Sequence, residues 1–176
     1  MTDTPKLSIV IPSYNRNATL LANLPILLRQ LSQDVELQIL DNCSKVPLAE
    51  TLAPLIAAPG CNRVKIIRHA TNIGAAANIL RSFEVANAPW VWILGDDDLL
   101  TADAVSLAMN AIESHPDASF INFLTSTMAL QGLRRMPFTT VGQSGFVQNH
   151  DYPGNVNFMS VGLRSEEHTS ELQSPM

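Results

Sequence analysis

Apolar and polar positions alternate in two ways along the first two thirds of the chain. Short runs rich in β-branched and aromatic residues have the length of buried strands; they cover residues 7–12, 35–40, 64–68, 90–94 and 118–124. Between these runs, apolar residues recur at helical spacing; the helical stretches are residues 20–31, 47–57, an alanine-rich segment between Gly74 and Asn87, and residues 101–114. Strands that alternate with helices predict an α/β fold, with a mostly parallel central sheet covered on both faces.

Two of the predicted helices contain a proline, and a third is rich in alanine. Pro25 is expected to kink or delimit its helix, because proline lacks the amide hydrogen of a helical bond, and Pro54 weakens the prediction of a helix at residues 47–57. The alanine-rich helix is expected to pack closely on the sheet through a stripe of small and apolar side chains, namely Ala76, Ile79, Leu80 and Phe83.

The regular pattern weakens after Leu124. Residues 133–140 are typical of an antiparallel edge strand, residues 142–157 of a loop, and residues 158–163 of a further strand. Residues 164–176 then break the composition abruptly, and they resemble the translation of a common sequencing adapter read in frame. We therefore expect an artefactual tail at 164–176 and a domain at 1–163 that is truncated at its carboxyl end; a genuine polar tail is the alternative.

Composition narrows the class of protein. The 176 residues suit one domain, and 46% hydrophobic against 15% charged residues allows a sizeable core. The net charge of −5 argues against nucleic acid as a partner. Two cysteines form neither a disulfide framework nor a paired metal motif. With no signal peptide and no apolar run near ~20 residues, we expect a cytoplasmic protein, with peripheral contact to the inner membrane left open.

Three consecutive carboxylates, Asp96, Asp97 and Asp98, follow the apolar run at residues 90–94. On an extended backbone, Asp96 and Asp98 would face one side and Asp97 the other. Carboxylates this close repel one another, and a divalent cation would remove that cost. Mg²⁺ and Mn²⁺ suit such oxygen ligands and often bind through one or two carboxylates plus substrate phosphates. A solvated turn that caps the following helix is the alternative.

Four polar clusters follow predicted strands, and in a parallel sheet such strand ends share one edge. The clusters are Ser13-Tyr14-Asn15, Asp41-Asn42, Asn72 with Asn78, and the Asp96–Asp98 triplet. The chain has neither a glycine-rich dinucleotide fingerprint nor a P-loop, so a phosphate ligand would need a metal on the triplet. Tyr14 is suited to pack against a base, and Asp41 to accept a hydrogen bond from a base or ribose.

Taken together, these motifs resemble the amino-terminal, nucleotide-sugar-binding part of a family 2 glycosyltransferase with the GT-A fold, a Rossmann-like three-layer sandwich. They appear in the family's order and spacing within roughly residues 7–124, at 7–16, 40–44, 72–78 and 94–98. The resemblance implies that the loop Pro12, Ser13, Tyr14, Asn15 and the carboxylate Asp41 hold the nucleoside. It also implies that the triplet is the family's DxD-type element, with Mn²⁺ or Mg²⁺ on the diphosphate. The donor-binding candidates further include Asn72, Asn78, Asp96 and Asp97, and the candidate metal ligands are Asp98 and Asp96.

The chain departs from the family pattern in two places. The commoner motif is Asp, any residue, Asp, Asp, and in one register Gly95 stands where the first Asp would be. In the other register Asp96 and Asp98 form the pair. In both registers Asp98 is the best candidate for the metal ligand. The resemblance also places the general base in a carboxyl-terminal half that this chain lacks. His150 and Asp151 are late titratable candidates whose context supports neither, so the catalytic base is left unassigned.

The resemblance implies an inverting transfer of sugar from a UDP-, GDP-, CDP- or dTDP-sugar to a saccharide or lipid-linked acceptor, in the manner of bacterial surface polysaccharide synthesis. A nucleotidyltransferase shares this layout but usually has a glycine-rich, basic loop after its first strand. Residues 12–17 contain no glycine and a single basic residue, Arg16, which makes that alternative weaker. A non-enzymatic fragment is the second alternative.

Deleting residues 164–176 is expected to leave the melting temperature unchanged, because a segment foreign to the core should pack on nothing. Thermal unfolding of the full and shortened chains, followed by circular dichroism, measures this. A clear drop in melting temperature, or slow amide exchange within the segment, would show that it belongs to the fold.

Overall fold

The computed structural model describes residues 4–58, 60–118, 120–123, 146–149 and 161–164. Its helices and strands follow one another in the alternating order that the sequence predicts. They are β1 (Leu7–Ser13), α1 (Asn17–Leu28), β2 (Val35–Asp41), α2 (Leu48–Ile56), β3 (Val64–Arg68), α3 (Ala75–Val85), β4 (Trp90–Ile93), α4 (Ala104–Ser114), β5 (Phe120–Phe123), β6 (Phe146–Asn149) and β7 (Val161–Arg164).

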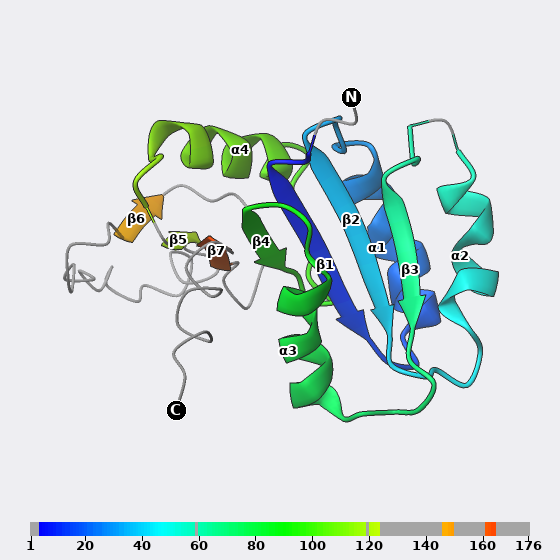
Figure 1. Cartoon of the computed structure of the whole chain (residues 1–176). Helices are drawn as coiled ribbons and strands as arrows, with labels where there is room; N and C mark the ends of the chain where they lie inside the picture. The colour runs from blue at the N-terminus through cyan, green and yellow to red at the C-terminus, as the bar shows by residue number, and fades with distance from the viewer. Residues whose placement is uncertain (1–3, 59, 119, 124–145, 150–160, 165–176) are drawn as a thin grey trace, which may run out of the picture.

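One sheet holds all the described strands in the order β3-β2-β1-β4-β7-β5-β6. The first four strands in that order are parallel to one another, and β7 runs antiparallel to both β4 and β5. The chain steps from β1 to β2 and β3 in one direction and then returns to place β4 on the other side of β1 (Figure 1). This reversal makes the gap between the ends of β1 and β4 the topological switch point, where open α/β sheets bind ligands.

Helices cover both faces of the sheet, which gives three layers (Figure 1). Alternate residues of a strand point to opposite faces. Ile9 and Ile11 of β1 belong to a large apolar cluster that includes buried residues of α1, α2 and α4, whereas Val10 belongs to a smaller cluster with Phe83 and Val85 of α3. The predicted α/β sandwich with a mostly parallel sheet is therefore confirmed.

Neither proline ends its helix. α1 continues past Pro25 and α2 continues past Pro54. An interior proline costs about 3 kcal/mol, but Leu20, Leu24 and Leu27 of α1 are all buried in the core. Burying each leucine stabilises the fold by about 1.5–3 kcal/mol, so packing outweighs the lost hydrogen bond.

The face that α3 turns to the sheet differs from the prediction. Ile79 and Leu80 are 45% and 64% exposed, Ala76 is exposed, and Phe83 alone of the expected stripe is half-buried. Asn78 and Ser82 face inward instead. Asn78 bonds through Oδ1 to Nε2 of His69 at 2.9 Å and donates from Nδ2 to the Leu40 carbonyl at 3.5 Å. These polar contacts set the rotation of the helix, which apolar periodicity alone does not show.

The strands after α4 agree only in part with the sequence pattern. β5 and β7 confirm the strands expected near residues 118–124 and 158–163, whereas β6 falls within a stretch expected to be a loop. The edge strand expected at 133–140 lies outside the described residues, and so do residues 165–176; Arg164 is the last residue of β7. No helix in the described ranges is long and apolar enough to cross a membrane.

A buried carboxylate near the amino ends of β1, β2 and β4 organises the strand starts. Glu36 is 5% exposed and accepts hydrogen bonds from Ser8 Oγ, from Gln38 Nε2 and from the backbone and side chain of Asn87. Burial by itself would raise the pKa of Glu36, but these donors outweigh it and hold the pKa below its ordinary value. The carboxylate thereby joins Asn87, three residues before β4, to strands β1 and β2.

Glu36→Gln is expected to lower the free energy of unfolding by about 1–3 kcal/mol at neutral pH. The Asn87 side-chain NH2 donates to both oxygens of Glu36, so the NH2 group of a glutamine would face another donor. Because the folded-state pKa is depressed, the advantage of the wild type is full above the unfolded value of about 4.3 and is lost as pH falls through the lower folded value. Urea unfolding of both proteins over a pH series measures the difference.

Glu113→Gln is the matched control, because the Glu113 side chain is 57% exposed and pairs only with Lys6 among the described residues. It is expected to change stability by less than about 0.5 kcal/mol. An equal loss in the two variants, or a Glu36 loss independent of pH, would contradict the role given to Glu36.

Candidate functional site

The site begins where β1 and β4 end at the switch point. Leu94, just past β4, donates its backbone N–H to the Val10 carbonyl at 2.9 Å. Further along, Ser13 at the end of β1 donates from Oγ to Oδ2 of Asp96 at 2.7 Å. These contacts hold the carboxyl end of β1 against the acidic triplet.

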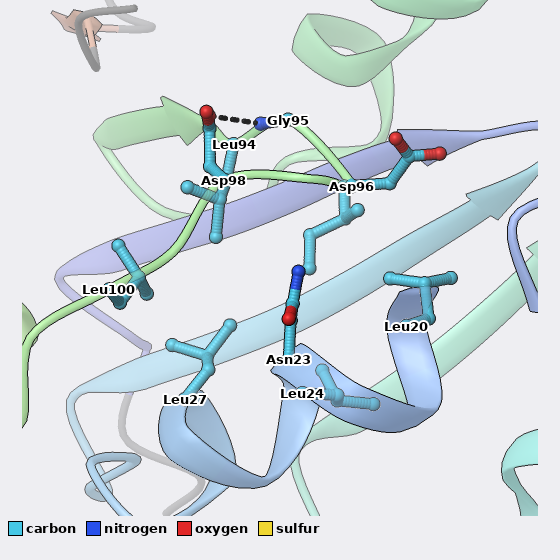
Figure 2. Close-up of a pocket in the computed structure, with 10 residues that line it drawn as sticks. Leu20, Asn23, Leu24, Leu27, Leu94, Gly95, Asp96, Asp98 and Leu100 are labelled. Atoms are coloured by element: carbon cyan, nitrogen blue, oxygen red, sulfur yellow. Dashed lines mark hydrogen bonds between the residues drawn. The ribbon is translucent and has the colours of Figure 1, made fainter. Parts of the chain in front are cut away.

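The triplet forms a turn rather than an extended strand end. The N–H of Asp98 donates to the Gly95 carbonyl at 3.2 Å, and Asp98 Oδ2 accepts from the Gly95 N–H at 2.9 Å. The expectation that Asp96 and Asp98 face one side is therefore wrong: Figure 2 shows the Asp98 carboxylate beside Gly95 and the Asp96 carboxylate pointing away from it. A Cβ on residue 95 would lie 2.8 Å from Asp98 Oδ2, so glycine leaves room for this orientation of the Asp98 carboxylate.

The turn concentrates negative charge in a partly buried place. Burial raises the pKa of Asp96, while the Ser13 hydroxyl and the Arg16 guanidinium oppose that rise. Burial also raises the pKa of Asp98, against the Gly95 N–H, and the neighbouring carboxylates add to the rise. The side chain of Asp97 is 64% exposed and lies 3.8 Å from Arg16 Nη2. A cation beside the turn would relieve this accumulation of charge.

Two hollows adjoin the turn and share Gly95 and Asp96 in their walls. The narrow one between α1 and the turn has a volume of about 10 Å³, about that of one water, and is lined by Asp98, Asn23 and apolar residues (Figure 2). The wide one has a volume of about 370 Å³, within the range of small-molecule sites. Its wall is built by Pro12, Ser13, Tyr14, Asn42, Asn72, Gly74, Ala75, Asn78, Ile79, Gly95 and Asp96.

The structure brings six of the predicted donor-binding residues to the wall of the wide cavity: Pro12, Ser13, Tyr14, Asn72, Asn78 and Asp96. Tyr14 is 42% exposed there. Asn15 lies outside the wall and joins two loops, since its N–H donates to Ser44 Oγ and its Oδ1 accepts from the Lys45 N–H. Its left-handed φ of 56° suits asparagine.

Asp41 lies beneath the cavity and not in its wall. It is fully buried, and its oxygens accept from the Ser44 N–H, the Leu48 N–H and Arg68 Nη1. Burial would raise the pKa of Asp41, but these donors outweigh it and lower the pKa. The carboxylate therefore secures the start of α2 and the loop that leads to it.

The neighbouring residue, Asn42, lies in the wall of the wide cavity. Its Nδ2 donates to Asn72 Oδ1 at 2.9 Å, and its Oδ1 accepts from the Ile73 N–H at 2.9 Å. The bonds link the ends of β2 and β3 below the cavity. Its position at the end of a predicted strand is a sequence signal for such a role, but Asp41 shares that signal. Both residues are buried, and their place relative to the cavity wall distinguishes them.

The carboxylates at the turn can hold a divalent cation only with help. Within the described ranges, no three His, Cys, Asp or Glu side chains form a group that could hold a metal ion. The carboxylates of Asp96 and Asp98 are half-buried and could each offer oxygen ligands to a metal. Mg²⁺ or Mn²⁺ commonly completes its ligand shell with substrate phosphates. The donor chemistry fits a metal–diphosphate unit. His150 and Asp151 lie outside the described residues.

Several proteins with related sequences are named as glycosyltransferases. An uncharacterized glycosyltransferase of Haemophilus influenzae is 33% identical over 115 residues, 65% of this chain and 37% of that protein. The abequosyltransferase of Salmonella typhimurium is 31% identical over 114 residues, 63% of this chain and 34% of that protein. The chain thus spans about a third of the length of these curated relatives.

Solved structures share the fold of this chain. A mannosyltransferase from Pyrobaculum calidifontis, in complex with GDP-Man and Mn²⁺, superposes with a TM-score of 0.68 at 13% identity, over 98% of this chain and 48% of that one. TarS residues 1–349 of S. aureus superpose with a TM-score of 0.58 at 20% identity, over 68% of this chain and 35% of that one. These likenesses show the GT-A fold.

The sequence profile described as Glycosyl transferase family 2 matches residues 8–164, which include every residue of the turn and of the cavity wall. The chain belongs to glycosyltransferase family 2.

Proposed function

We propose that this chain forms the donor-binding part of a metal-dependent, inverting glycosyltransferase. The observation that carries the proposal is the wide cavity at the switch point, whose wall runs directly into the half-buried carboxylates of the turn. A nucleotide-sugar has an apolar base at one end and a charged diphosphate in the middle. The wide cavity offers a surface for the base, and the acidic turn beside it offers a place for the metal-bound diphosphate.

The nucleoside occupies the wide cavity in this proposal. Tyr14 presents an exposed ring suited to stacking on a base. Asn42, Asn72 and Asn78 give the opposite part of the wall its polar groups. Asp41 contributes indirectly, because it holds the loop that carries Asn42.

In this proposal Asp98 and Asp96, whose carboxylates point apart in the turn described above, would turn toward a shared Mn²⁺ or Mg²⁺, and Asp97 remains at the exposed side of the turn. When bound, the ion offsets the charge that develops on the departing nucleoside diphosphate. The GDP-Man and Mn²⁺ in the Pyrobaculum calidifontis mannosyltransferase support this assignment. The family match favours glycosyl transfer over nucleotidyl transfer.

Inversion needs a base that deprotonates the acceptor hydroxyl on the face opposite the leaving group. Among the described residues in the cavity wall, the titratable side chains are Tyr14 and Asp96, and Asp96 already accepts a hydrogen bond from Ser13. We therefore assign to the described residues the binding of the donor and not the activation of the acceptor. The acceptor class that we propose is a saccharide or a lipid-linked saccharide.

Asp98→Asn is expected to weaken the Mn²⁺-dependent binding of a nucleoside diphosphate by about 100-fold or more, because a neutral amide is a poor ligand for a divalent cation. Asparagine can still accept from the Gly95 N–H, so the melting temperature should change little. Calorimetry with UDP, GDP, CDP and dTDP, in Mn²⁺ and in EDTA, measures the affinities.

Asp103→Asn is the matched control, since Asp103 is an exposed aspartate that precedes α4 and lies outside both hollows. It should bind as the wild type does. Equal affinities for wild type and Asp98→Asn, or the same affinity in Mn²⁺ and EDTA, would refute the metal assignment.

The chain is further expected to bind donor without transferring sugar. A missing general base typically costs 10²–10⁴-fold, about 3–5 kcal/mol, and lost acceptor positioning costs more. Incubation with Mn²⁺ and UDP-, GDP-, CDP- and dTDP-sugars, with and without a lipid-linked acceptor, tests this. Acceptor-dependent release of nucleoside diphosphate above the Asp98→Asn background would show that the base lies within this chain.

A further inference from the structure

Arg16 places a positive charge beside the acidic turn. It lies between the cavity loop, which contains Ser13 and Tyr14, and the first residue of α1. Its Nε is 4.0 Å from Asp96 Oδ1, and its Nη2 is 3.8 Å from Asp97 Oδ2. One guanidinium therefore bridges two of the three carboxylates.

The two ion pairs are loose. Both distances exceed the range of a hydrogen bond, so the attraction is Coulombic and not directional. The Arg16 side chain is 53% exposed, and exposed pairs of this kind contribute little to stability. An arginine that served only to fasten the turn would be expected to form the closer, forked contacts that guanidinium and carboxylate groups make.

The backbone of Arg16 has a separate task. Its carbonyl accepts the N–H of Leu20 at 3.0 Å, which is the first turn of α1. Its side chain makes no capping hydrogen bond to that helix. The side chain can therefore turn to a new partner without disturbing the helix start.

We infer that Arg16 is an exchangeable counter-ion: it neutralises Asp96 and Asp97 in the metal-free chain and passes to the donor diphosphate when a divalent cation binds the turn. The inference rests on the proposed function and assigns a further donor-binding residue to it. A divalent cation beside Asp96 would repel the guanidinium and neutralise the carboxylate charge that attracts it. A diphosphate provides a new anionic partner, and the planar fork of arginine matches phosphate oxygens.

The exchange predicts changes of opposite sign for the two ligands. In Arg16→Gln, Mn²⁺ alone no longer competes with a resident cation and should bind about three- to fivefold more tightly. The same variant lacks the phosphate contact, so a nucleoside diphosphate at saturating Mn²⁺ should bind about tenfold or more weakly. A residue with a merely structural role would shift both affinities in the same direction.

Electron paramagnetic resonance of free Mn²⁺ measures the first affinity, and calorimetry with UDP, GDP, CDP and dTDP at saturating Mn²⁺ measures the second. Arg16→Lys keeps the charge without the fork, so it should bind Mn²⁺ as the wild type does and the diphosphate with intermediate affinity. Arg29→Gln removes the same charge at the opposite end of α1 and should change neither affinity.

The outcomes separate this inference from the function beneath it. If the wild type binds both ligands and Arg16→Gln weakens both or changes neither, the counter-ion exchange is refuted and the donor site stands. If the wild type binds neither Mn²⁺ nor any of the four diphosphates, the proposed function fails and the role of Arg16 fails with it.

Discussion

The hydrogen bond from Ser13 to Asp96 joins two residues that are 83 positions apart in the chain and adjacent at the end of the sheet. It forms where the strand order reverses between β1 and β4, so its two partners leave the sheet toward different helices. The cavity wall and the acidic turn both begin at this bond. A parallel sheet with this order therefore creates the site as a consequence of its topology, before any ligand is considered.

Three further polar residues hold the loops around that bond. Asp41 binds the start of α2 and Arg68, Asn15 joins the loops after β1 and β2, and Asn42 joins the ends of β2 and β3. None of these contacts needs a ligand to form. The loops of the site are thus organised in advance, which reduces the ordering cost of binding.

The alternation of strands and helices was predictable because each element buries one apolar face, and burial leaves a period in the sequence. What the sequence could not show depends on partners that are distant along the chain. Asp41 and Asn42 lie together at the end of β2, but they have different partners. Asp41 accepts hydrogen bonds from Arg68 and from the Leu48 N–H, whereas Asn42 bonds to Asn72 and to the Ile73 N–H. The rotation of α3 and the turn at Asp96–Asp98 likewise depend on local hydrogen bonds, those of Asn78 to His69 and Leu40 and those between Asp98 and Gly95.

The absence of a side chain at Gly95 limits which residues can occupy position 95. The folded-back carboxylate of Asp98 occupies the space that a side chain on residue 95 would need. An aspartate at position 95, as in the commoner motif, and the present orientation of Asp98 are therefore mutually exclusive. A side chain at position 95 would require the Asp98 carboxylate to leave the Gly95 N–H, so the identity of residue 95 sets the orientation of a side chain three positions further along the chain.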